Sequence, residues 1–232
     1  MTGTLVNSAA VLAGTAIGVA VGSRLPGGIQ ERVLAGLGLV TLVLGVDNAL
    51  AWSDTSPLIV MGAILLGGIA GEAIGIERRL RQLGDAIQER VAGEGPSRVS
   101  EGFVTASLLF CVGPLTVVGS IQDGLTGDYD TLVTKSLLDG FASIAFASTL
   151  GWGVGLAAGT VLVVQGAISL GASPFDSVLG EGTEALAALQ SAGGILIIGI
   201  ALKLLGLRDV GVGNFLPALV FAPCLVGVVS LF

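Results

Sequence analysis

The sequence predicts an all-α fold, a polytopic bundle of transmembrane helices. Its 232 residues are 53% hydrophobic and only 12% charged, whereas an ordinary soluble domain is about 25% charged. The mean hydropathy is +0.93. The apolar residues gather in runs of about 20, the length that an α-helix needs to cross a bilayer. These observations predict a single integral membrane domain over residues 1–232, with the lipid bilayer as its first partner.

Eight apolar runs are long enough to span a membrane. We expect helices at residues 3–23, 33–51, 57–76, 102–120, 131–150, 152–171, 185–206 and 212–231. The first run is longer than a signal-peptide core of roughly 7 to 15 residues, so we expect it to stay attached. The fourth and fifth spans are the least regular, because Pro114 interrupts one and a polar segment separates the two.

The basic residues predict the orientation. Nine of the ten Lys and Arg lie at the end of, or after, expected spans one, three and seven, and Lys135 is the exception. Those loops share one side of an eight-span chain, and short cytoplasmic loops collect Lys and Arg. We therefore expect both termini to be extracytoplasmic.

Residues 76–92 predict a different element. Their apolar residues recur at steps of four, three, four and four: Ile76, Leu80, Leu83, Ile87 and Val91. This is the stripe of an amphipathic helix. We expect it on the cytoplasmic membrane face or against a neighbouring loop; a solvated connector is the alternative.

Two internal alignments predict an inverted-topology repeat of the kind found in secondary transporters. One matches residues 25–52 with 125–152. The other matches Ala13-Gly14-Thr15 with Ala158-Gly159-Thr160 and Pro57 with Pro217. We prefer the second alignment, because it leaves the polar segment in the unpaired middle. It divides the chain into repeat one at 1–76, a linker at 77–99, a central hairpin at 100–150 and repeat two at 151–232.

Glycines also recur every four residues in three triplets: Gly14, Gly18 and Gly22; Gly67, Gly71 and Gly75; Gly151, Gly155 and Gly159. Such spacing clears one helix face so that two backbones can approach closely. We expect packing faces, and a homo-oligomer is one way to use all three.

The principal candidate site lies on the fifth span. Lys135 and Asp139 are four residues apart, so they can pair on one helix face beside Ser136. If the helix begins near Thr131, Asp139 is about 12 Å along it, near the middle of a core about 30 Å thick. An ionisable residue there is a candidate functional site. Asp139 either exchanges its Lys partner for a cation or proton, or belongs to a permanent structural ion pair.

The segment 120–128 adds Gln122 and Asp123 to the candidates. It contains two Gly turns, Asp123-Gly124 and Thr126-Gly127-Asp128, which disfavour a continuous helix. With Pro114 nearby, we expect an interrupted or re-entrant element, which membranes tolerate where it is buried or lines a watery cavity. A plain external turn is the alternative.

Three further polar residues complete the candidate set: Asn7, Glu72 and Asn214. Glu72 either joins a pathway for the transported solute or reaches Arg78 and Arg79 at the membrane surface, and we favour the second.

The composition argues against nucleic-acid binding and against metal binding by histidine. An excess of seven acidic residues over basic ones argues against nucleic-acid binding, and the absence of His removes the commonest metal ligand.

We also expect no enzyme and no cofactor beyond a coupling proton or sodium ion. The sequence has no HExxH and no GxxxxGK phosphate loop. Cys111 and Cys224 lie in apolar runs, where a thiol acts as a small apolar side chain.

The sequence resembles a prokaryotic membrane-protein family catalogued as domain of unknown function 554. The resemblance lies in the residues 119–128, in Lys135-Ser136-Leu137-Leu138-Asp139 and Phe146-Ala147-Ser148, and in Asn7, Gly71-Glu72, Ser191-Ala192-Gly193-Gly194 and Asn214-Phe215-Leu216-Pro217. It implies a protein of the prokaryotic cytoplasmic (inner) membrane and implies no substrate.

Two functional hypotheses follow. The first is a secondary transporter or channel for an ion or small polar solute, coupled to protons or sodium through the embedded carboxylate. The second is a non-transporting membrane scaffold or envelope-assembly factor, in which the same polar residues hold the helices together.

Overall fold

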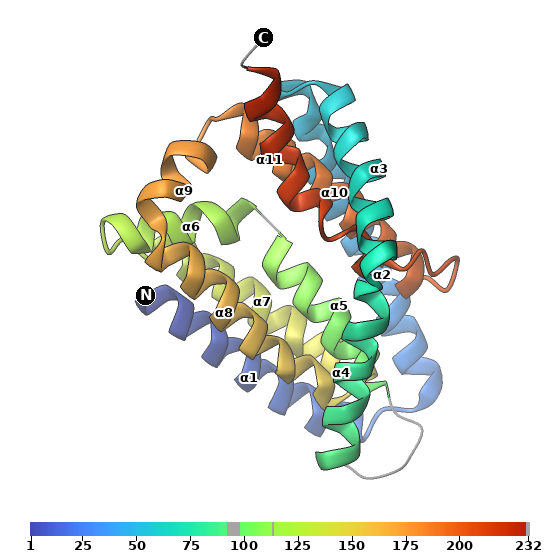
Figure 1. Cartoon of the computed structure of the whole chain (residues 1–232). Coiled ribbons are helices and arrows are strands. Elements are labelled where there is room, and N and C mark those ends of the chain that lie inside the picture. Colours follow the sequence, from blue (N-terminus) through green and yellow to red (C-terminus); the bar gives the residue numbers. More distant parts are fainter. Residues whose placement is uncertain (92–97, 113, 231–232) are drawn as a thin grey trace.

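The structure is a computed structural model that describes residues 1–91, 98–112 and 114–230 (Figure 1). All regular elements in those ranges are helical. The α-helices are α1 (Thr2–Gly22), α2 (Gly27–Ala49), α3 (Pro57–Ile74), α4 (Ile76–Val91), α5 (Val99–Val112), α6 (Pro114–Leu125), α7 (Asp130–Leu150), α8 (Ala157–Leu170), α9 (Ala172–Leu179), α10 (Glu184–Leu204) and α11 (Ala218–Val229). The 3-10 helices are η1 (Leu50–Asp54), η2 (Trp152–Leu156) and η3 (Val212–Phe215).

The helices form two groups that meet along α5 and at the contact of α2 with α7. In Figure 1, α1, α7 and α8 lie together on one side, whereas α2, α3, α10 and α11 lie together on the other. We call the end of the molecule that holds Arg24, Arg81 and Lys203 the basic end. The opposite end, which holds Met1 and Tyr129, is the acidic end.

The helices α1 and α7 pack most closely, because glycines line one face of α1. A side chain at Gly14, Gly18 or Gly22 would overlap a carbonyl oxygen of α7, at Gly140, Ile144 and Ser148 respectively. The two helices run in the same direction, since Gly3 meets Leu132 at the other end of the pair. The first predicted glycine triplet is therefore a packing face.

The second triplet behaves similarly over two of its members. Gly67 and Gly71 of α3 meet the backbone of Ala218 and Asn214. Gly75 instead ends α3 in the left-handed conformation, with φ 72°, which glycine adopts without steric cost.

The third predicted triplet is wrong as a packing face. Helix α7 ends at Leu150, and Gly151 turns the chain with φ 81°. A 3-10 segment then precedes α8, so the three glycines do not share one continuous helix face. Gly155 meets Thr15, but the space beside Gly159 is open.

Three antiparallel helix contacts are compatible with the preferred repeat alignment, which stays a prediction. Helix α1 contacts α8, α2 contacts α10 and α3 contacts α11. These are the pairs that the second alignment equates. The direction of the α2 and α10 contact is clear, because Gly38 meets Leu205 whereas Gly45 meets Ile198.

The fourth expected span is broken. Helices α5 and α6 are bent by 61° across the break, and α6 begins at Pro114, which cannot donate a backbone hydrogen bond. The Thr116 hydroxyl donates a 2.8 Å bond to the Phe110 carbonyl across the break. The pair connects the two ends of the molecule: Gly102 meets Leu150 at the basic end, whereas Asp123 meets Met1 at the acidic end.

The expected loop at 120–128 is largely helix. Helix α6 continues through the Asp123-Gly124 pair to Leu125, so the predicted turn there is wrong. Gly124 packs its bare face against the Ser169 carbonyl, and this contact stabilises helix where glycine disfavours it. The turn at Gly127 exists, with φ 75°.

Six helices of the described chain are long and apolar enough to cross a membrane, or seven if the bent pair counts as one. Helix α7 has 21 residues but contains Lys135 and Asp139 within its length. The count of eight spans therefore stays a prediction.

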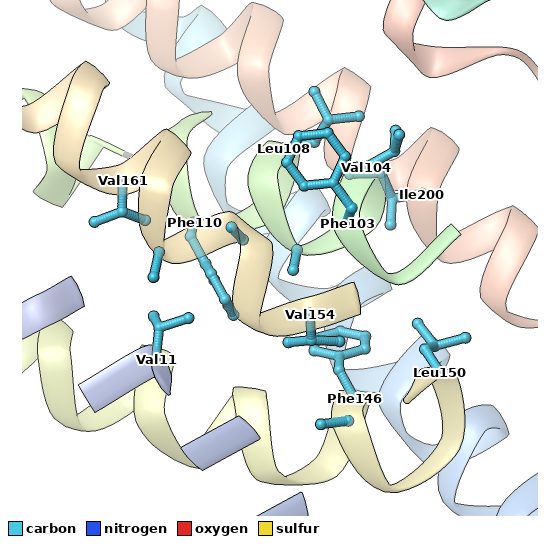
Figure 2. Packing of buried hydrophobic residues seen from close by; sticks show 14 of the residues in the cluster. Val11, Phe103, Val104, Leu108, Phe110, Phe146, Leu150, Val154, Val161 and Ile200 are labelled. Carbon is cyan, nitrogen blue, oxygen red and sulfur yellow. The ribbon is translucent and has the colours of Figure 1, made fainter. Parts of the chain in front are cut away.

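The amphipathic helix expected at 76–92 is confirmed as α4, which ends at Val91; residue 92 lies outside the described ranges. It contacts α5 and η3 rather than a loop alone. Leu80 of α4 packs against the main core of the protein. This core joins α1, α5, α7, α8 and α10 (Figure 2). Phe110, Phe146 and Val154 are among its fully buried members.

Candidate functional site

The centre of the site is an ion pair on α7. Lys135 and Asp139 lie one helical turn apart, and the Lys135 ammonium contacts Asp139 Oδ2. Asn7, on the neighbouring α1, donates a hydrogen bond of 2.9 Å to the same oxygen. The close approach of α1 and α7 brings Asn7 to this carboxylate, so the glycine face positions the site.

All three side chains are buried. Asn7 is 0%, Lys135 5% and Asp139 7% exposed. Removing a charge from water is costly unless it gains a partner and hydrogen bonds. The Lys135 ammonium also lies 5.9 Å from the centre of the Phe110 ring, within the range of a cation–π interaction. The site therefore holds one cation and one anion beside an aromatic face.

Two serines of α7 extend the polar face. The Ser136 hydroxyl donates a 2.6 Å bond to the Leu132 carbonyl of its own helix. Ser143 is fully buried, and its hydroxyl has no hydrogen-bond partner in the described chain. The Ser136 hydroxyl therefore bonds to its own helix rather than to the ion pair.

Gln122 and Asp123 lie nearer the acidic end, on α6. Gln122 accepts a 2.8 Å bond from the Thr131 hydroxyl, which holds α6 against α7. The Asp123 carboxylate is 2.9 Å from the Met1 ammonium. Its second oxygen is buried without a partner among the described residues.

Glu72 and Asn214 are paired at the basic end, apart from the α7 ion pair. The Asn214 amide donates a 2.6 Å bond to Glu72, and its oxygen accepts a 2.8 Å bond from the Glu77 backbone. Glu77 in turn accepts from the Gly213 backbone at 2.7 Å. The expected contact of Glu72 with Arg78 and Arg79 is not among the ion pairs of the described residues, and the Glu72 carboxylate accepts from Asn214 instead.

The eight sequence-predicted residues thus separate into three places. Asn7, Lys135, Ser136 and Asp139 lie together at the α1 and α7 contact. Gln122 and Asp123 lie toward the acidic end, and Glu72 and Asn214 lie at the basic end.

Sequence reasoning included Ser120 only as part of the candidate segment 120–128, treated Gln165 as a helix contact and did not consider Thr4, yet the structure makes all three prominent. Thr4, Ser120 and Gln165 are all fully buried, and no residue that the structure describes bonds to their side-chain polar atoms. A signal existed for Thr4, which precedes Asn7 by three residues and so shares its helix face. Gln165 is an isolated amide in an apolar helix, which predicts helix contact as readily as function.

A charged network at the basic end joins α4 to the loop after α10. Asp209 lies 3.0 Å from Arg81 and 3.1 Å from Lys203. Partial burial opposes ionisation of Asp209, but the Gly211 backbone N–H and the two cations lower its pKa overall. The Arg81 pKa is raised, chiefly by its hydrogen bond to Glu77. Both shifts favour the charged, paired state.

The fold and this buried pair define a class: a multi-pass helical membrane protein with ionisable residues in its interior. The chain belongs to a family described as "Protein of unknown function (DUF554)", whose model matches residues 2–227.

Two relatives cover nearly the whole chain. It is 31% identical over 234 residues to "Uncharacterized membrane protein YdfK" of Bacillus subtilis (strain 168), covering 100% of this chain and 98% of the relative. It is 29% identical over 225 residues to "Uncharacterized protein YqgA" of Escherichia coli (strain K12), covering 95% and 94%. No solved structure matches the chain significantly.

Proposed function

We propose that the protein is a secondary transporter or channel for an ion or small polar solute, with Asp139 as the central residue of its pathway. The observation that carries the proposal is the buried contact of Asp139 with Lys135 and Asn7. Ionisable residues within membrane helices are costly, and they commonly mark ion pathways and proton relays.

The chemistry of the site suits exchange. A cation or proton that reaches Asp139 neutralises the carboxylate and weakens its attraction for the Lys135 ammonium. The Asn7 amide can then keep its hydrogen bond to the Asp139 carboxylate, or its side chain can rotate away. Because Asn7 belongs to a different helix from the ion pair, a change at the carboxylate alters the α1 and α7 contact directly.

The broken helix supports the same proposal. Transporters built from inverted repeats place discontinuous helices around their binding sites. Here the break between α5 and α6 follows Phe110, whose ring faces the Lys135 ammonium. The antiparallel contacts of α1 with α8, α2 with α10 and α3 with α11 favour a repeat of this kind. In the cytoplasmic membrane, the basic end would face the cytoplasm.

The second candidate is a membrane scaffold. One observation favours it: the Lys135 and Asp139 charges are already paired with each other and with Asn7. A buried pair of this kind is also compatible with a purely structural role.

Flux measurements in proteoliposomes test the proposal. Wild type, Asp139→Asn and the matched control Asp128→Asn, which alters an exposed loop carboxylate, are compared under imposed proton and sodium gradients. The proposal expects gradient-dependent flux in wild type and Asp128→Asn, and its loss in folded Asp139→Asn. Absence of flux in folded wild type, or equal flux in all three proteins, overturns it in favour of the scaffold.

A further inference from the structure

Beside the ion pair, the interior contains a set of buried polar groups that lack partners. Thr4, Asn7, Ser120 and Gln165 are each 0% exposed. The Thr4 and Ser120 hydroxyls, the Asn7 amide oxygen and both amide atoms of Gln165 have no hydrogen-bond partner in the described part of the chain. We call these four residues the polar cluster. A buried polar group without a hydrogen-bond partner destabilises the folded protein. Several such groups near one another are therefore unexpected unless a ligand binds them.

An apolar layer fixes where the polar cluster lies. Val11 of α1, Phe110 of α5 and Val161 of α8 belong to one buried core cluster (Figure 2). One turn from Val11 toward the acidic end lies Asn7, and one turn from Val161 in the same direction lies Gln165. Because α1 and α8 run antiparallel, with Ser8 bonded to Ala158 and Met1 beside Gly166, Gln165 lies nearer the acidic end than Asn7, and Thr4 lies between their levels.

Helix α6 brings Ser120 near the first turn of α1, because Gly119 and Gly3 both lie against Leu132. Gly124 of α6 lies directly against the Ser169 carbonyl of α8. Ser120 precedes Gly124 by four residues, and Gln165 precedes Ser169 by four, so each lies one turn before the contact. Helices α1, α6 and α8 all contact one another. The polar cluster therefore occupies the crossing of three helices, on the acidic side of the apolar layer.

The donor set indicates the ligand. Among the unpartnered atoms are four oxygens, two from hydroxyls and two from amides, and the four side chains carry no charge. Hard cations prefer oxygen ligands, whereas divalent sites usually use several carboxylates. In the described residues, no group of three or more His, Cys, Asp or Glu could hold a metal ion. Neutral oxygens suit a monovalent metal cation here, because Asn7 bonds to the buried Asp139 carboxylate and Ser120 lies about one turn from the buried Asp123 carboxylate.

We propose that Thr4, Asn7, Ser120 and Gln165 form a binding site for a monovalent metal cation, of which sodium is the member we test. Asn7 links this site to Asp139, because its amide nitrogen donates to the carboxylate while its oxygen is free for the cation. The inference deepens the proposed function and, as a coupling site, rests on it. Cation binding itself is measurable without transport.

Thermal unfolding in detergent tests the site. Wild type, Gln165→Leu and the matched control Gln190→Leu, a glutamine of α10 outside the cluster, are melted at equal ionic strength in choline chloride and in sodium chloride. A ligand that binds the native state raises its stability with concentration. We expect sodium to raise the melting temperature of wild type and Gln190→Leu above that in choline. We expect the sodium concentration for half of this effect to rise at least about tenfold in Gln165→Leu.

The choline series provides a second readout. Replacing an unpartnered buried amide with an apolar side chain of similar size removes its desolvation penalty. In choline, Gln165→Leu is therefore expected to melt at or above the wild-type temperature, which shows that the variant folds. Equal melting of wild type in sodium and choline, or an unchanged sodium response in Gln165→Leu, overturns the inference.

The two proposals fail separately. A sodium-dependent melting shift without any flux overturns the transport function and leaves the cation site in place. Flux that depends on Asp139 without any sodium-dependent shift overturns the cation site and leaves transport in place.

Discussion

Asn7 and Asp139, 132 residues apart in the chain, are joined by a hydrogen bond of 2.9 Å in the buried contact of α1 and α7. Asp139 also contacts Lys135 of its own helix. One carboxylate oxygen thus receives donors from two helices. A change in its protonation or occupancy therefore affects the packing between those helices as well as the charge of the site.

We expect Asn7→Leu to weaken the fold and the proposed transport together. The variant deletes a hydrogen bond to a charged group and leaves Asp139 with one donor fewer, at a cost of about 1–3 kcal/mol. Equilibrium unfolding in detergent measures the stability. Asn48→Leu is the control, because Asn48 is half-buried and its amide donates to the Leu44 carbonyl of its own helix rather than to a charged group. An Asn7→Leu protein as stable as this control would contradict the role given to Asn7.

The packing of α1 on α7 leads to a second prediction. Gly18→Ala is expected to destabilise the protein by about 1–3 kcal/mol, because the added methyl group meets the Ile144 carbonyl oxygen and cannot be accommodated without moving a helix. Gly159→Ala is the matched control, since the space beside Gly159 is open, and its effect should stay within about 1 kcal/mol. Unfolding of both variants in one detergent compares them. Equal destabilisation would show that close backbone contact does not determine the effect.

The Asp209 network predicts acid sensitivity at the basic end. The pKa of Asp209 is lowered in the folded protein, so its contribution to stability is present above the unfolded-state pKa of about 3.9. That contribution is lost as the pH falls through the lower folded-state pKa. The raised Arg81 pKa has no effect in this window, because Arg81 stays charged. We expect α4 to loosen from the loop after α10 below about pH 4.

A spin label attached through Gln82→Cys, in a background of Cys111→Ala and Cys224→Ala, measures this loosening. Label mobility should rise as the pH falls through the acid range. In Asp209→Asn the mobility should already be high at neutral pH and should change little on acidification. Identical pH profiles in the two proteins would show that Asp209 does not hold α4 in place.

The sequence was sufficient for the helical class, for α4 and for the Lys135 and Asp139 pair, because each depends on local spacing. The i,i+4 relation places two side chains on one face whatever the rest of the chain does. It was also sufficient for the Gly14, Gly18 and Gly22 face, although its partner helix was not predictable.

The errors arose where tertiary contacts override local preference. Asp123-Gly124 has the composition of a turn, yet α6 continues through it because Gly124 packs against α8. Glu72 has two arginines nearby in sequence, yet it pairs with Asn214 from a distant segment. The polar cluster as a set was not predictable for the same reason: Ser120, a member of the candidate segment 120–128, and Gln165 come together only when α6 and α8 are in contact.

The central claim is that the buried pair serves transport rather than folding alone, and a charge-free replacement tests it most directly. Exchanging a buried ion pair for apolar residues of similar size is often neutral or stabilising, so Lys135→Met combined with Asp139→Leu should fold. The measurement is gradient-driven flux in proteoliposomes that contain wild type or this double variant, with unfolding curves of both. The account predicts that the double variant folds, with a stability lowered by at most about 1–3 kcal/mol because the Asn7 amide loses its acceptor, and that it loses flux. A folded double variant that transports as wild type does would contradict it.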